Sequence, residues 1–215
     1  MAKTTELVFI LDKSGSMGGL ESDTIGGYNS FLKKQQKTKS DVRITTVLFD
    51  DKYELLHDRL DIKAVEPITD KDYFVEGSTA LLDAVGKTIQ KIDGTQQRSK
   101  KEYRADKVLF VITTDGMENA SREYTYDKIK QMIEAKKEAG WEFIFLGSNI
   151  DAVEVAGHIG IAPNRSANHS TDAKGMDAMF ASVSEVARKF SLSNGEIDDN
   201  WAKDIEDDYE NREKD

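Results

Sequence analysis

The chain has 215 residues, no cysteine and a formal net charge of -10. This length suits one domain with a sizeable core, and the missing cysteines exclude disulfides, thiolate metal sites and cysteine nucleophiles. The acidic balance argues against nucleic acid or an anionic membrane as the main partner. Near the N-terminus only five strongly apolar residues follow Lys3, too few for a signal-peptide core or a membrane span. We therefore expect a cytoplasmic protein.

The first strong signal is the apolar run 7–11, which ends in Asp12-Lys13-Ser14-Gly15-Ser16. An apolar run that stops at polar residues predicts a buried parallel strand with a site at its carboxyl end. Side chains two residues apart can point the same way, so Asp12, Ser14 and Ser16 are expected to converge. One carboxylate and two hydroxyls suit a hard divalent cation such as Mg2+. Taken alone, the same residues are more typical of a solvated strand-to-helix loop than of a metal site.

The next elements are a predicted helix and a predicted β-hairpin. The apolar spacing predicts a helix from Leu20 to Lys37, in which Gly26-Gly27 is expected to permit close packing against the sheet. The β-branched stretch Asp41 to Phe49 is predicted as a strand, followed across Asp50-Asp51 by a second strand over Tyr53 to Asp58. This hairpin predicts an antiparallel strand at the sheet edge, with its two acids as turn residues rather than metal ligands.

A long connection then leads to Gly77-Ser78-Thr79, where a second helix is predicted to begin. Its apolar residues keep helical spacing as far as Ile92, and Gly94 is expected to end it. The polar stretch 96–107 is predicted as a surface loop. Thr79 therefore presents a hydroxyl at the start of a helix.

The stretch Val108 to Ile112 is predicted as a strand buried on both faces, and Thr113-Thr114-Asp115-Gly116 follows it. Asp115 is thus a second carboxylate after a buried strand. The remaining elements are predicted as a helix over 129–139, a strand over 143–146, a short helix over 151–157, a weak strand within 159–167 and an amphipathic helix from 171 to 190. Strands that alternate with helices after one hairpin imply an α/β fold with a doubly wound, mainly parallel sheet.

The C-terminal stretch differs in composition, because from Glu196 to Asp215 ten acidic residues face three basic ones. Its apolar residues recur every four positions and predict one face of an acidic helix: Ile197, Trp201, Ile205 and Tyr209. We divide the chain into a domain over 1–192 and an acidic helical tail over 193–215. The tail is interpreted either as a helix docked on the domain or as a partner-binding arm.

The order of the polar stretches resembles that of von Willebrand factor type A (vWA) domains. In that family D-x-S-x-S, a distant Thr and a distant Asp form the metal-ion-dependent adhesion site, and here they match Asp12, Ser14, Ser16, Thr79 and Asp115. The resemblance implies a Rossmann-like fold and a bound Mg2+ or Mn2+. It also implies a non-enzymatic protein-binding module in which a partner Asp or Glu completes the metal coordination. Cytoplasmic bacterial and phage proteins of this kind resemble adaptors of ATPase machines or stress-response complexes.

One alternative comes from a different class of protein, the haloacid-dehalogenase-like phosphatases. Those enzymes also place an Asp after the first strand of a doubly wound sheet and bind Mg2+. They resemble this chain less, because their motif requires a second Asp as general acid at the position that Ser14 occupies. A serine hydrolase is not indicated either, since Ser14 and Ser16 lie outside any G-x-S-x-G elbow.

Overall fold

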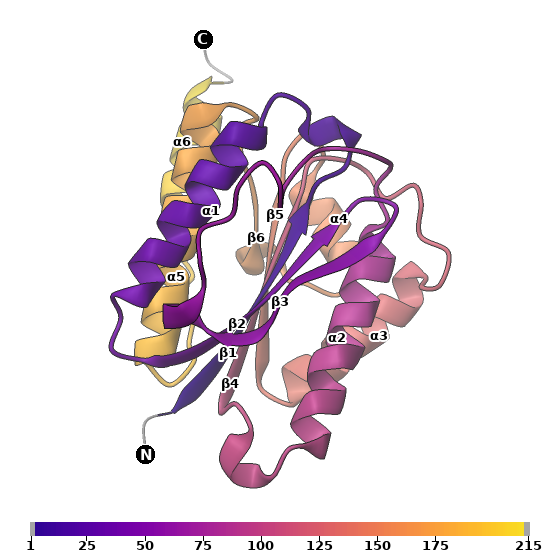
Figure 1. Cartoon of the computed structure of the whole chain (residues 1–215). Coiled ribbons are helices and arrows are strands. Elements are labelled where there is room, and N and C mark those ends of the chain that lie inside the picture. Colours follow the sequence, from indigo (N-terminus) through magenta and orange to yellow (C-terminus); the bar gives the residue numbers. More distant parts are fainter. Residues whose placement is uncertain (1–2, 213–215) are drawn as a thin grey trace.

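The computed structural model describes residues 3–212, and its centre is a sheet of six strands in the order β3-β2-β1-β4-β5-β6 (Figure 1). All neighbouring strands are parallel except β2 and β3, so β3 is the antiparallel edge strand. The fold class predicted from the sequence is confirmed. In chain order the strands are Thr4–Asp12, Asp41–Phe49, Tyr53–Asp61, Lys107–Thr114, Trp141–Gly147 and Ser166–Asn168.

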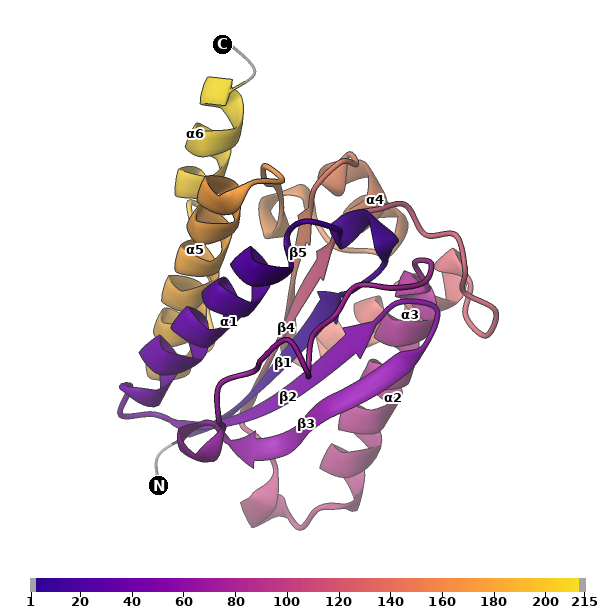
Figure 2. The ribbon, with the colours of Figure 1, turned by 45° about the horizontal axis from the view of Figure 1, so that its top comes forward.

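Helices cover both faces of this sheet (Figures 1 and 2). Helices α1, α5 and α6 pack on one face, and α2, α3 and α4 pack on the other. In chain order α1 to α6 span Glu21–Gln36, Leu81–Arg98, Tyr126–Glu138, Ala152–His158, Ala173–Leu192 and Lys203–Arg212. Alternate residues of β1 face the two cores, for example Phe9 on the α1 side and Ile10 on the α2 side. This central burial explains the uninterrupted apolar run 7–11 in β1.

The glycine pair of α1 has a different role from the predicted one. A Cβ at Gly27 would lie 2.1 Å from the ring of Phe180, so this glycine lets α5 pack closely on α1. Gly26 has no atom within 4 Å of the corresponding position. The close approach is therefore between two helices, and the prediction of packing against the sheet was wrong.

Helix α2 is longer than predicted, because it continues through Gly94 to Arg98. Gln96 explains part of this extension: its side chain donates to the carbonyl of Ala105 and accepts from the amide of the same residue. These contacts hold the last helical turn against the segment that leads into β4. The polar residues after position 96 therefore begin inside a helix, and the predicted loop is shorter.

The C-terminal segment packs on the domain through its apolar stripe. Ile197, Trp201 and Ile205 are buried in the core on the α5 side, and the helix begins only at Lys203. Residues 196–202 form no regular helix, unlike the prediction, because polar contacts to the chain before β6 hold them. The division of the chain after residue 192 stays a prediction, and 213–215, the end of the predicted tail, lie outside the described residues.

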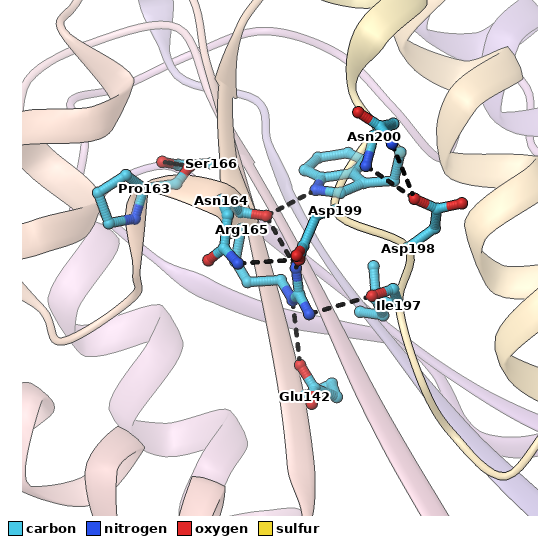
Figure 3. Close-up of polar contacts among 10 residues, drawn as sticks. Glu142, Pro163, Asn164, Arg165, Ser166, Ile197, Asp198, Asp199 and Asn200 are labelled. Atoms are coloured by element: carbon cyan, nitrogen blue, oxygen red, sulfur yellow. Dashed lines mark hydrogen bonds and ion pairs between the residues drawn. The ribbon is translucent and has the colours of Figure 1, made fainter.

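Those polar contacts centre on Arg165 (Figure 3). Its guanidinium group donates to the carbonyl of Ile197 at 3.1 Å and to a carboxylate oxygen of Asp199 at 2.9 Å. The indole nitrogen of Trp201 donates to the carbonyl of Asn164 at 3.0 Å. The C-terminal segment is thus fixed by buried apolar area and by a local network of hydrogen bonds. None of the helices in the described part of the chain is long and apolar enough to cross a membrane.

Candidate metal centre

The five predicted metal-site residues lie at the carboxyl edge of the sheet, around its two central strands. β1 pairs with β2 on one side and with β4 on the other, so the connections leaving β1 and β4 run to opposite sides. Open α/β sheets form their binding sites at such a switch point. Asp12 is the last residue of β1, and Asp115 follows β4 directly.

Asp12 is fully buried, and hydrogen bonds orient both of its carboxylate oxygens. Oδ1 accepts from the amide of Ser14 at 2.7 Å. Oδ2 accepts from the hydroxyl of Thr114 at 2.7 Å and from the amide of Asp115 at 3.2 Å. Burial raises the pKa of Asp12, and these hydrogen bonds oppose the rise. The carboxylate is therefore held in one orientation and links the loops after β1 and β4.

Three hydroxyl groups form a cluster beside this carboxylate. The Oγ atoms of Ser14 and Ser16 lie 3.1 Å apart, and Thr79 Oγ1 donates to Ser14 Oγ at 3.0 Å. The loop after β4 passes beside them, since a Cβ at Gly116 would lie 3.0 Å from Ser16 Oγ and 3.4 Å from Thr79 Oγ1. The structure thus brings the three predicted hydroxyls together although Thr79 is 65 residues from Ser14 in sequence.

Asp115 is the second buried carboxylate of the site. Its Oδ1 accepts from Ser148 Oγ at 2.8 Å and from Asn149 Nδ2 at 2.5 Å. Its Oδ2 is buried and has no hydrogen-bond partner among the described residues. Burial raises the pKa of Asp115, and the bonds from Ser148 and Asn149 oppose the rise. A buried acceptor without a donor is costly, and a cation would satisfy it.

The donor set fits a hard divalent cation. Two carboxylates and three hydroxyls supply only oxygen, which Mg2+ and Mn2+ prefer. Within residues 3–212 no group of three His, Cys, Asp or Glu side chains gathers as a metal site, so hydroxyl ligands are essential to this set. The residues could hold such an ion with Ser14, Ser16 and Thr79 as neutral ligands and the two carboxylates as the balancing charge.

The loop that carries Thr79 is held in place by contacts with the loop after β4. The amide of Thr79 donates to Asn119 Oδ1 at 3.0 Å, and its carbonyl accepts from the amide of the same Asn119 at 3.0 Å. The carboxylate of Glu118 accepts from the amide of Leu82 at 2.9 Å, in the first turn of α2. An acid at this position stabilises the start of α2, which follows Thr79 in the chain.

The loop after β1 is held in place by contacts with the β2–β3 hairpin. Lys13 Nζ lies 3.5 Å from Asp50 Oδ2 and 3.2 Å from Glu54 Oε2, and it stands over the ring of Phe74 at 4.5 Å from the centroid. Both Lys13 and Asp50 are buried. The interpretation of Asp50 as a turn residue was therefore incomplete, because this acid pairs with a lysine inside the D-x-S-x-S motif.

Sequence reasoning missed several residues that position the site: Lys13, Asp50, Thr114, Glu118, Asn119, Ser148 and Asn149. Ser148 and Asn149 directly follow a buried strand, so the same edge-of-sheet argument that selected Asp115 applies to them. Lys13 had no comparable signal, since a lysine in a polar loop is exposed in most proteins. Only its contacts across the sheet edge reveal its role.

A doubly wound sheet with hydroxyls and carboxylates gathered at its switch point defines a class of Rossmann-like binding domains. The chain belongs to the von Willebrand factor type A domain family, whose model matches residues 6–182. The resemblance inferred from Asp12, Ser14, Ser16, Thr79 and Asp115 is therefore confirmed at the level of the family. Comparison with curated proteins finds no match.

Solved structures with the same fold share little sequence with the chain. The vWF domain of the pilus tip protein Mfa5 from Porphyromonas gingivalis is 12% identical with a TM-score of 0.63, over 93% of this chain and 99% of that one. Manganese-loaded TRAP of Plasmodium vivax is 16% identical with a TM-score of 0.57, over 84% and 74%.

Proximal thread matrix protein 1 from the mussel byssus, with a zinc-occupied MIDAS motif, is 13% identical with a TM-score of 0.55, over 87% of this chain and 46% of that one. Our chain thus spans less than half of that protein. At such identities the likeness shows the fold alone. Two of these proteins carry a divalent metal, zinc in the byssus protein and manganese in TRAP.

Proposed function

We propose that this protein is a non-enzymatic module that binds a partner protein through a divalent metal ion. The metal, Mg2+ or Mn2+, would be held by Asp12, Ser14, Ser16, Thr79 and Asp115, and it would offer a coordination position to an Asp or Glu of the partner. The observation that carries the proposal is the buried Oδ2 of Asp115, which lacks a hydrogen-bond partner among the described residues, while the next residue, Gly116, lies beside the hydroxyl cluster.

The mixture of ligands supports the role of a partner carboxylate. If each of the five side chains binds through one oxygen, the octahedral shell of Mg2+ keeps a position for a ligand from outside the chain. A further anionic ligand gains a strong bond at such an ion. The residues of the chain supply orientation: Thr114 and Ser14 fix Asp12, and Ser148 and Asn149 fix Asp115.

The surroundings of the motif argue against a phosphatase. Ser14 occupies the position at which that class of enzyme has its general acid. Its hydroxyl is hydrogen-bonded to the hydroxyls of Ser16 and Thr79. None of these groups is a base that accepts a proton near neutral pH. We expect no hydrolysis of para-nitrophenyl phosphate in Mg2+; hydrolysis that disappears in Asp12→Asn would favour the enzyme.

The setting that we propose is cytoplasmic, in a bacterium or phage, with the module as an adaptor of an ATPase or stress-response complex. The chain has no cysteine, which is compatible with a reducing compartment. The acidic net charge of -10 favours a partner with a basic surface around its metal-binding acid.

The decisive experiment has two stages. Isothermal titration calorimetry with MgCl2 and MnCl2 measures whether the wild type binds the ion and whether Ser14→Ala loses binding. Ser30→Ala, an exposed serine on α1, is the matched control. Affinity capture from lysate follows in Mg2+, in EDTA and with Ser14→Ala. Partners retained only by the metal-bound wild type support the proposal; equal capture in all three arms contradicts it.

A further inference from the structure

The structure contains a groove directly beside the candidate metal centre, between the start of α3 and helix α4. It has a volume of about 640 Å³. Two chain segments join it to the metal centre. Met117 stands two residues after Asp115, and Ile150 follows Asn149, whose amide group donates to Asp115. A ligand bound at the metal would therefore reach this groove with its neighbouring residues.

Part of the wall of the groove is apolar. Met117, Tyr126, Ile150 and Val155 line it, and Met117 is 70% exposed. An unbranched thioether side chain with this exposure is adaptable and suits contact with the aliphatic part of a ligand side chain. Tyr126 adds an aromatic ring, partly buried, that a cation can approach.

The charge of the groove is negative. Three acids line it, Asp127, Asp151 and Glu154, and all three are exposed. Asp127 and Glu154 form no ion pair within residues 3–212, whereas Asp151 caps α4 by accepting from the amide of Glu154. The groove also contains Lys130 and His158. The unpaired acids Asp127 and Glu154 beside an apolar wall provide charge complementarity for a long side chain with a cationic end.

We infer that the partner segment carries an Arg or Lys close in sequence to its metal-binding acid, and that this basic side chain lies in the groove between α3 and α4. The inference rests on the proposed function and specifies its partner. The stem of the basic residue would pack on Met117 and Tyr126. Its charged end would face Asp127 and Glu154. An acid alone would bind the metal, and the pair of opposite charges would give specificity.

The test uses a random peptide library displayed on phage, selected on the immobilised protein in Mg2+ with elution by EDTA. The wild type is expected to enrich peptides that contain an Asp or Glu and, at a preferred spacing, an Arg or Lys. The variant Asp127→Asn/Glu154→Gln removes two charges from the groove. Both side chains are exposed and make no ion pair among the described residues, so the fold should persist.

The matched control is Glu66→Gln/Glu138→Gln, which removes two exposed acids away from the groove. For a selected peptide, the groove variant should lower the affinity about fivefold, as expected for two partly exposed charge pairs. The control should leave the affinity unchanged. Replacing the basic residue of the peptide by norleucine should have the same effect on the wild type and none on the groove variant.

The outcomes separate this inference from the proposed function. Enrichment of acidic peptides without any preference for a basic residue would contradict the binding of a basic side chain in the groove. The metal-mediated mechanism would not be affected. Equal affinities for the groove variant and the wild type would likewise contradict binding in the groove alone. An absence of peptides eluted by EDTA would overturn both. A basic preference that disappears only in the groove variant would support both.

Discussion

The ammonium group of Lys13 lies 3.5 Å from a carboxylate oxygen of Asp50, and both side chains are almost completely shielded from solvent. This pair joins the loop after β1 to the turn between β2 and β3. Asp50 also accepts from the amide of Lys52 with its other oxygen, and its carbonyl accepts from the amide of Ala80. One buried ion pair thus ties together the two loops that carry Ser14 and Thr79.

The first prediction follows from this pair. Lys13→Met should lower the free energy of unfolding by about 3 kcal/mol, because it leaves the carboxylate of Asp50 buried without a counter-ion. Lys13→Met/Asp50→Asn should recover most of the loss. Urea denaturation in EDTA measures both, and Lys52→Met, which removes an exposed pair with Glu76, is the control. A Lys13 variant as stable as the control would contradict the role of the pair.

The second prediction concerns stabilisation by metal. If the site binds Mg2+ only in the folded state, a concentration of one hundred times the dissociation constant should raise the free energy of unfolding by about 2.7 kcal/mol. Ser14→Ala should lose most of this gain, and Ser30→Ala should keep it. Thermal denaturation with increasing MgCl2 provides the measurement. An equal gain in all three proteins would indicate that the ion binds elsewhere.

The third prediction distinguishes the destabilisation caused by the buried charge of Asp115 from the contribution of that charge to metal binding. Burial raises the pKa of Asp115, so its ionised form opposes folding, and this loss of stability accumulates as the pH rises above the usual Asp range. In EDTA at neutral pH, Asp115→Asn should therefore unfold at higher urea concentration than the wild type. In saturating Mg2+ the order should reverse. The same order in both buffers would exclude Asp115 as a metal ligand.

The fourth prediction concerns His169, whose buried side chain has its pKa lowered by desolvation to about 4. As the pH falls below 6.5, the unfolded chain takes up a proton that the folded chain does not. Stability should therefore fall by about 3 kcal/mol between pH 6.5 and pH 4 through this group. His169→Gln should remove this part of the slope in urea denaturation, while exposed His158→Gln should not. Burial also lowers the pKa of His57, so some slope from histidine remains.

The fifth prediction tests the docking of the C-terminal segment. Trp201→Ala should cost about 3–5 kcal/mol, the usual range for an aromatic residue removed from a core. Leu192→Ala, an apolar residue that is 55% exposed, should cost far less. Urea denaturation distinguishes the two. Similar values for both variants would mean that the segment contributes little to the stability of the domain.

Some features followed from the sequence alone because they depend on local periodicity. The apolar runs predicted the central strands, the β-branched stretch before Asp50 predicted β2 with its observed bounds, and the hairpin predicted the antiparallel edge strand. The order D-x-S-x-S, Thr79, Asp115 indicated the vWA family, which the family model confirms. The central strands are apolar along most of their length because helices cover both faces of the sheet there.

Other features required the tertiary structure, because they arise between residues far apart in the chain. The sequence contained no sign that Lys13 would be buried, that Gly27 would contact Phe180, or that Asn119 would hold Thr79. The helix through Gly94 likewise depends on the contacts of Gln96 with Ala105. Local sequence determined which residues could form the site; the packing of the loops at the sheet edge decided which side chains hold them in place, since burial and pairing exist only after the chain has folded.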